Sequence, residues 1–170
     1  MKKGSKGFSL IELLIVVAII LIIAAIAIPN LLRSRIAANQ ASAVGSLRTL
    51  NTAEITYATT YNTGYTSYLG YLGPPVSGTT ITSTAAGLID SVLAGSASSN
   101  QVYTSTKSGY TFAYTPGTAD ASGRINTYTI TASPITVGTT GTNYYFTDMS
   151  GVIRQNSTTT AGSTDSPLAG

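Results

Sequence analysis

The chain has 170 residues, of which 43% are hydrophobic and only 9% are charged, and it contains no Cys, His or Trp. Charged residues make up about a quarter of an ordinary soluble domain, so the surface must be polar without being ionic. Without Cys there are no disulfides or thiol nucleophiles, and without His the commonest general base and transition-metal ligand are absent. We therefore expect neither an enzyme nor a bound cofactor.

The basic residues are unevenly distributed along the chain. Three of the nine, Lys2, Lys3 and Lys6, lie in the first seven positions, and the remaining six balance six acidic residues. Nucleic-acid-binding domains concentrate Lys and Arg on one surface, and no such concentration is present. We therefore predict no dedicated nucleic-acid site.

A long apolar segment follows the basic start. Sixteen consecutive apolar residues run from Leu13 to Ile28, and residues 8–28 together give twenty-one residues before Pro29. A helix of that length spans roughly 30 Å, the hydrocarbon core of a bilayer. Basic residues flank it, three lysines before it and Arg33 and Arg35 after it, which favours an orientation with the amino terminus inside. The pattern predicts a membrane-spanning helix over residues 8–28.

Two general interpretations of this segment leave something unexplained. A secretory signal peptide cleaved after Ala25-Ile26-Ala27 would have an unusually long apolar region with an acidic residue, Glu12, near its start. A plain membrane anchor explains the length but not Glu12, because an acidic side chain costs about 2.5–3.5 kcal/mol at mid-membrane.

A third interpretation accounts for the string KGFSLIE at residues 6–12. Followed by the apolar run and Pro29, this string resembles the class III signal of type IV prepilins and type II secretion pseudopilins. In that family a membrane aspartyl peptidase cleaves after the Gly and methylates the new amino-terminal Phe. The resemblance implies a leader of residues 1–7 carrying the charges of Lys2, Lys3 and Lys6, with cleavage between Gly7 and Phe8 and N-methylation of Phe8.

The resemblance also gives Glu12 a physical role. A carboxylate in an apolar helix must be neutralised or paired. In a filament core built from packed copies of this helix, the α-amino group of Phe8 in a neighbouring copy is the available cation, and the pair would fix the axial register. Pro29 falls twenty-second in the processed chain, as the family pattern requires. We therefore assign Phe8, Glu12 and Pro29 to assembly.

From Pro29 onward the apolar residues recur at helical spacing. Seven of them fit one face of an amphipathic helix over residues 29–62, with Pro29 interrupting or kinking the helix because it lacks an N–H. The seven are Leu32, Ile36, Ala43, Leu47, Leu50, Tyr57 and Tyr61.

Residues 63–155 are predicted to form a globular head. A loop is expected from Gly64 to Gly78 and a short helix from Ala85 to Ala94. Segments rich in Tyr, Thr, Ile and Val predict four strands, with a turn at Asp148–Gly151. The predicted strands are Tyr110–Tyr114, Tyr128–Ala132, Tyr144–Thr147 and Val152–Gln155.

The predicted fold class is therefore α+β. A long amino-terminal helix, half transmembrane and half amphipathic, packs on a small antiparallel sheet, in agreement with the ladle-shaped pilin fold that the resemblance implies. Residues 156–170 lack a hydrophobic period and are predicted to be a flexible tail. Asp120, Asp148 and Asp165 could supply oxygen ligands to calcium, but their spacing matches no calcium loop, and we interpret them as turn residues.

These observations predict a structural protein, a pilin of a type IV pilus-like filament that serves adhesion, motility or DNA uptake. The first alternative is a pseudopilin of a type II secretion system, and a weaker one is a membrane-anchored binding domain that does not polymerise. The resemblance implies a prepilin peptidase, other copies of the chain, a membrane platform protein and an assembly ATPase as partners, and membrane lipid before assembly. We expect a single-pass protein of the cytoplasmic membrane with its carboxyl-terminal domain outside, followed by an extracellular or periplasmic filament.

Overall fold

The structure, a computed structural model, describes residues 8–75, 80–95 and 101–168. Gly7 and the three leader lysines, Lys2, Lys3 and Lys6, lie outside the described residues. The chain divides into two compact units, Met1–Arg35 and Ile36–Gly170, which we call the first and second units.

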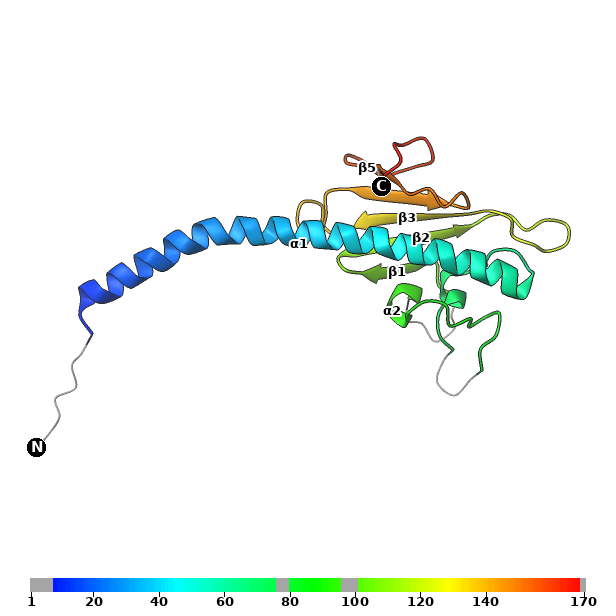
Figure 1. Cartoon of the computed structure of the whole chain (residues 1–170), viewed down its shortest axis with the longest axis horizontal. Coiled ribbons are helices and arrows are strands. Elements are labelled where there is room, and N and C mark those ends of the chain that lie inside the picture. Colours follow the sequence, from blue (N-terminus) through cyan, green and yellow to red (C-terminus); the bar gives the residue numbers. More distant parts are fainter. Residues whose placement is uncertain (1–7, 76–79, 96–100, 169–170) are drawn as a thin grey trace, which may run out of the picture. The chain divides into compact units, whose positions relative to one another are not determined.

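Helix α1 runs from Leu10 to Tyr61 and contributes to both units (Figure 1). It ends where Asn62 adopts a left-handed conformation with φ of 54° while its N–H still bonds to the Ala58 carbonyl at 3.1 Å. Asn tolerates this conformation better than most residues, and it commonly closes a helix. The predicted end of the helix near Asn62 is confirmed.

Within the second unit, one face of α1 is buried against the sheet. Ala43, Leu47, Leu50, Glu54 and Tyr57, spaced three or four residues apart, are all buried. This spacing keeps them on one side of a helix with 3.6 residues per turn. The predicted amphipathic pattern is therefore confirmed over this part of the helix.

The sheet has five antiparallel strands in the order β1-β2-β3-β4-β5, so each strand pairs with its neighbours in sequence. The strands lie side by side along the second-unit part of α1 (Figure 1). The bounds are β1 Thr104–Lys107, β2 Tyr110–Pro116, β3 Tyr128–Pro134, β4 Tyr144–Asp148 and β5 Arg154–Asn156. The α+β class, with a long amino-terminal helix and an antiparallel sheet, is confirmed.

Four of the strands were expected from the sequence, and β1 was not. Its residues, TSTK, carry no large hydrophobic side chain, and only Ser105 is buried. As an edge strand β1 needs little apolar surface, so the hydrophobic alternation that marks β2 and β3 is absent from it. The predicted turn at Asp148–Gly151 is confirmed by the Gly151 N–H, which donates to the Asp148 carbonyl at 2.9 Å.

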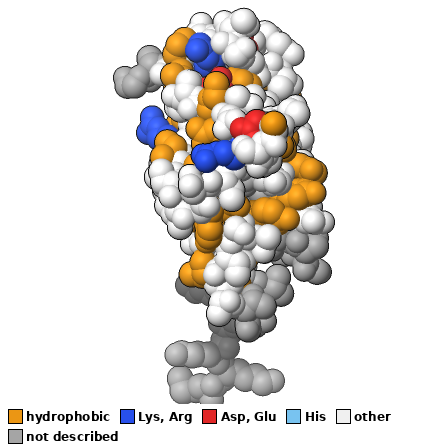
Figure 2. Space-filling model, turned by 90° about the vertical axis from the view of Figure 1, so that its right-hand side faces the viewer, with side chains coloured by type: hydrophobic (Ala, Val, Ile, Leu, Met, Phe, Trp, Pro, Cys, Tyr) orange, Lys and Arg blue, Asp and Glu red, His pale blue; other side chains and the backbone are white. Residues whose placement is uncertain are grey.

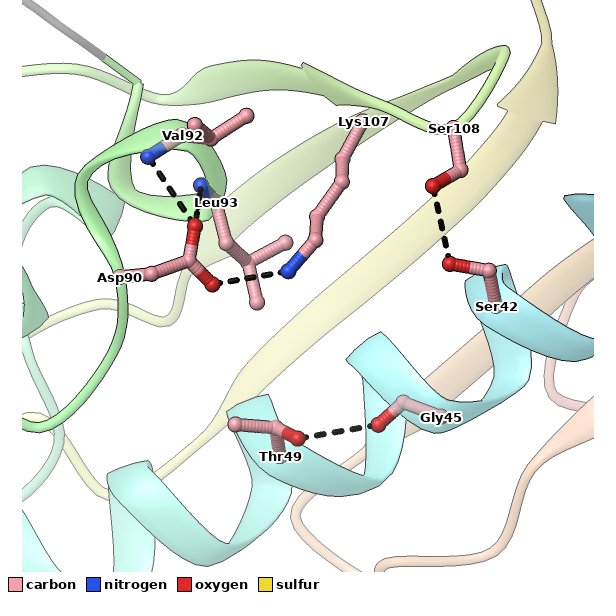
Figure 3. Close-up of polar contacts among 8 residues, drawn as sticks. All are labelled: Ser42, Gly45, Thr49, Asp90, Val92, Leu93, Lys107 and Ser108. Carbon is pink, nitrogen blue, oxygen red and sulfur yellow. Dashed lines mark hydrogen bonds and ion pairs between the residues drawn. The ribbon is translucent and has the colours of Figure 1, made fainter.

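The predicted helix from Ala85 to Ala94 is wrong in its first part. Helix α2 comprises only Ser91–Ala94, while Ala86 and Leu88 donate backbone hydrogen bonds to the carbonyls of Tyr71 and Leu72 at 2.8 Å. The helix starts late because Asp90 caps it, its carboxylate accepting from the N–H groups of Val92 and Leu93 (Figure 3). A short 3₁₀ helix, η1, spans Leu69–Leu72.

The carboxyl-terminal segment is more ordered than the predicted flexible tail. Up to Leu168, the last described residue, it pairs with the free edge of β5: Gln155 N–H donates to the Ser166 carbonyl at 3.0 Å and Leu168 N–H to the Ile153 carbonyl at 2.8 Å. Ala161 is buried. This segment is ordered because an edge strand offers unpaired backbone N–H and C=O groups, and a polar segment can bond to them without a hydrophobic period.

Candidate functional site

The described part of the first unit exposes all of its large hydrophobic side chains. Over residues 8–35 their exposed fractions range from 40% at Leu32 to 83% at Phe8. Contiguous apolar surface of this extent is rare on a soluble monomer and marks a surface that contacts lipid or protein. By length and composition this part of α1 could cross a membrane, with a mean hydropathy of 3.3 over its most apolar 18-residue window.

Two of the predicted site residues, Phe8 and Glu12, lie at the start of α1. Helix α1 begins at Leu10, so Ser9 is its N-cap and Glu12 its third residue. The Ser9 N–H donates to Glu12 Oε2 at 2.9 Å, which is one half of a capping box. Phe8 immediately precedes the cap. The spacing Ser-x-x-Glu is visible in the sequence and could have identified this contact.

Pro29 lies inside α1 and apart from this pair. It is seventeen residues beyond Glu12, which is about 25 Å along a helix at 1.5 Å per residue. Pro has no N–H, so the Ala25 carbonyl four residues earlier lacks its helical donor. The structure thus brings Phe8 and Glu12 to one end of α1 and leaves Pro29 well away from them.

A second polar site, which the sequence analysis missed, lies in the core of the second unit. Glu54 on α1 is fully buried. Its carboxylate accepts hydrogen bonds from the Thr66 N–H at 3.0 Å and the Thr66 hydroxyl at 2.6 Å, and Tyr114 O–H donates to the Thr66 carbonyl at 2.7 Å. Burial raises the pKa of Glu54, against the opposing effect of these hydrogen bonds. The sequence does offer a signal for this site, because Glu54 is an acidic residue within the otherwise apolar face of α1.

A second buried polar contact ties α1 to β3 and β4. Asn51 Nδ2 donates to Thr147 Oγ1 at 2.8 Å, and Tyr128 O–H donates to Asn51 Oδ1 at 3.1 Å. Buried polar groups are costly unless they are paired, so these contacts fix how the strands seat on the helix. The hydrogen bonds of Asn51 therefore have a structural role, joining α1 to β3 and β4.

The three aspartates considered as calcium ligands each serve a separate turn. Asp120 accepts from Ser122, Arg124 and Asn126, and the Ser122 hydroxyl bond chiefly holds the pKa of Asp120 below its usual range. Asp148 accepts from the Ser150 N–H at 2.9 Å. Asp165 accepts from Asn156 and Gly162. Among the described residues, no three acidic, His or Cys side chains converge on one point.

Comparisons with known proteins concern the amino-terminal region. Residues 2–28 match the family described as the prokaryotic N-terminal methylation motif. The chain is 49% identical over 53 residues to the type IV major pilin protein PilA of Myxococcus xanthus, which covers 31% of this chain and 24% of that protein. It is 65% identical over 37 residues to the type IV wide pilus major component PilA4 of Thermus thermophilus, covering 22% of this chain and 28% of that protein.

The matched segments therefore span about a quarter of the length of each of these relatives. No solved structure matches the chain significantly.

Proposed function

We propose that this chain, a member of the type IV pilin family by its amino-terminal methylation motif and its pilin relatives, is a structural subunit that polymerises into a pilus-like filament through its amino-terminal helix. The observation that carries the proposal is the exposed apolar surface of residues 8–35, interrupted near its start by a single acidic residue, Glu12. Such a surface needs lipid or like helices around it.

Processing would precede assembly. A prepilin peptidase would cut between Gly7 and Phe8, remove the leader that carries the three lysines, and methylate the Phe8 amino group. Removal of the leader leaves the new α-amino group only four residues before Glu12, at the same end of the helix.

Assembly would then move the apolar helix from lipid into a core of like helices. This transfer exchanges one apolar environment for another, so the hydrophobic effect contributes little net free energy. An assembly ATPase acting through a membrane platform protein would supply the work. The Glu12 carboxylate and the Phe8 ammonium of adjacent copies would neutralise each other and select the correct register, with Pro29 locally loosening the helix.

Before assembly the chain would cross the cytoplasmic membrane once, with the second unit outside. After assembly it would lie in an extracellular filament that serves adhesion, motility or DNA uptake.

Mass spectrometry of filaments sheared from cells that express the chain tests the proposal. We expect a chain that begins at N-methylated Phe8 in the sheared fraction. A processed chain found only in the envelope fraction would instead support a periplasmic pseudopilin. A chain that begins at Met1, or one cut after Ala27, would contradict processing at Gly7 and with it the proposed function.

A further inference from the structure

A groove runs along the second-unit part of α1 beside the segment that precedes α2. It has a volume of about 320 Å³ and is lined by five residues of α1 and by Leu88 from the segment before α2. The α1 residues are Arg48, Thr49, Thr52, Ala53 and Thr56. We call it the α1 groove.

The α1 groove is less polar than its sequence indicates. The hydroxyls of Thr49, Thr52 and Thr56 donate to the carbonyl oxygens of Gly45, Arg48 and Thr52 at 3.0, 3.0 and 2.8 Å. Figure 3 shows the Thr49 hydroxyl turned back along the helix toward Gly45. Because each hydroxyl is occupied by the backbone four residues earlier, the γ-methyl groups remain to contact a partner.

One charge lies at this apolar surface. The Arg48 side chain is exposed, and its guanidinium makes no hydrogen bond or ion pair with any other described residue. A groove of methyl groups beside an unpaired cation fits a partner that presents an apolar side chain next to a carboxylate.

The chain itself presents such a pair at the β4–β5 turn, Asp148–Gly151. Met149 is 52% exposed, and the adjacent Asp148 carboxylate accepts only the local Ser150 N–H among the described residues. The turn is held in place because Asn51 on α1 donates to the Gly151 carbonyl at 3.4 Å. Met is a flexible side chain that adapts well to shallow apolar grooves.

The other charged side chains of the described second unit are buried, or they pair or hydrogen-bond within the same copy. Lys107 pairs with Asp90 at 2.8 Å (Figure 3), and Glu54 is buried. The remaining ones hydrogen-bond within their own regions: Arg124 with Asn62, Arg154 with the Asp165 carbonyl, Asp120 with its turn, and Asp165 with Asn156. Charged groups are sparse on the surface as a whole, as Figure 2 shows for one face. Arg48 and Asp148 are thus the complementary charges left for a partner.

The two surfaces lie on adjoining faces of α1. Asn51 contacts the β4–β5 turn, whereas Ala53 lines the α1 groove with Leu88. Ala53 is two positions from Asn51, about 200° around the helix, whereas Arg48 is three positions away and lies on a neighbouring face, about 60° from Asn51. Among the described residues, Asp148 and Arg48 of one copy form no ion pair with each other, so both charges are open to a second copy. Contacts of this kind between different surfaces propagate into open helical filaments.

We propose that the β4–β5 turn of one copy docks in the α1 groove of the next, with Met149 against the threonine methyls and Leu88, and with Asp148 paired with Arg48. This docking rests on the proposed function and names a subunit contact within the filament. The docking would make the addition of subunits to the filament specific, because a like charge at either Arg48 or Asp148 would oppose the contact.

Charge reversal in the full-length chain tests the docking, with the yield of sheared filaments as the measurement. Arg48→Glu and Asp148→Lys should each lower the yield about tenfold or more, because each places like charges opposite one another. The double reversal should restore most of the yield. Arg124→Glu is the matched control, since it makes the same charge change outside both surfaces. For each variant, the amount of protein in the cell and the state of its amino terminus are measured as well, to check that the variant is made and inserted.

The outcomes separate the docking from the proposed function. If the wild-type chain forms no filament, the proposed function fails. If the wild type assembles and both single reversals assemble equally well, the docking is refuted while the proposed function stands. A double reversal as defective as the single variants also refutes the pairing.

Cross-linking gives a second test that does not depend on charge. The chain has no Cys, so Thr52→Cys combined with Met149→Cys introduces a unique pair. Oxidised filaments should give a ladder of cross-linked copies on non-reducing gels. Thr52→Cys combined with Ile135→Cys, an exposed position outside the turn, should give none. Equal ladders from both pairs, or none from the first, would overturn the docking.

Discussion

The Glu54 carboxylate is bonded twice by a single residue, Thr66, through its backbone N–H at 3.0 Å and its hydroxyl at 2.6 Å. Both residues are fully buried, and they join α1 to the loop that follows it. The ionisable groups that face Glu54 are Tyr57 on α1, Tyr114 on β2 and Tyr128 on β3, and none of them is a cation at neutral pH. Among the described residues, hydrogen bonds therefore stabilise the Glu54 carboxylate without a counter-charge.

Replacing Glu54 should change how the stability of the second unit depends on pH. Burial raises the pKa of Glu54 above its ordinary value of 4.5, so the folded chain keeps a proton that the unfolded chain releases. The resulting contribution to the free energy of unfolding is fully present below pH 4.5 and is lost as the pH rises through the raised pKa. The facing tyrosines, whose pKa values are also raised, do not titrate in this window.

Thermal unfolding of the full chain in detergent micelles, followed by circular dichroism between pH 4 and pH 8, measures this effect. The wild-type Tm should fall as the pH rises, and Glu54→Gln should flatten the curve because Gln does not titrate. If Tm depends on pH in Glu54→Gln as steeply as in the wild type, Glu54 is not the source of the pH dependence.

Thr66→Val should destabilise the second unit by about 1–3 kcal/mol, because it removes the hydroxyl donor and leaves a buried acceptor unpaired. The loss should be larger at pH 7 than at pH 4, since the hydroxyl stabilises the ionised carboxylate. Denaturant unfolding at the two pH values gives the comparison. Ser67→Ala, an exposed neighbouring change, is the control and should have little effect at either pH.

Asn51→Ala should cost about 2 kcal/mol of unfolding free energy, because the hydroxyls of Thr147 and Tyr128 lose a buried partner. Adding Thr147→Val should recover part of the loss by removing one orphaned hydroxyl. The double-mutant cycle is measured by chemical denaturation, with the exposed Thr60→Ala as control. Strictly additive losses would show that Asn51 and Thr147 do not interact energetically.

Glu12→Gln separates the two roles available to Glu12. The Gln carbonyl can still accept the Ser9 N–H and complete the helix cap, but it carries no charge. If pairing with the Phe8 ammonium drives assembly, Glu12→Gln should lose sheared filaments as completely as Glu12→Ala, while membrane insertion and processing remain. Normal filament yield from Glu12→Gln would leave capping as the role of Glu12.

Asp165→Ala should loosen the carboxyl-terminal segment. Asp165 accepts from Asn156 Nδ2 at 2.9 Å and from the Gly162 N–H at 2.7 Å, and both bonds would be lost. Amide hydrogen exchange over residues 157–168 should accelerate, with little change in β2 and β3. Asp165→Asn keeps an oxygen acceptor, so its amide exchange rate over these residues should lie between those of the wild type and Asp165→Ala. Rapid exchange in the wild-type segment would instead favour the flexible tail predicted from its composition.

The sequence by itself determined the elements that depend on short-range patterns. The apolar run to Ile28 predicts a helix, because its signal is contiguous. The helical spacing of Ala43, Leu47 and Leu50 likewise predicts which face of α1 is buried. Strands β2 and β3 follow from their aromatic and β-branched residues.

Only the tertiary structure decided the features that depend on partners distant in the chain. Strand β1 has no hydrophobic pattern and exists because β2 offers it a ladder. The pairing of Asn51 with Thr147 joins residues 96 positions apart, and no local signal specifies it. The α1 groove reads as polar in sequence and is apolar in the fold, because the helix backbone takes up its threonine hydroxyls. Hydrogen-bond partners are chosen by where the folded chain places them, and local composition does not encode that placement.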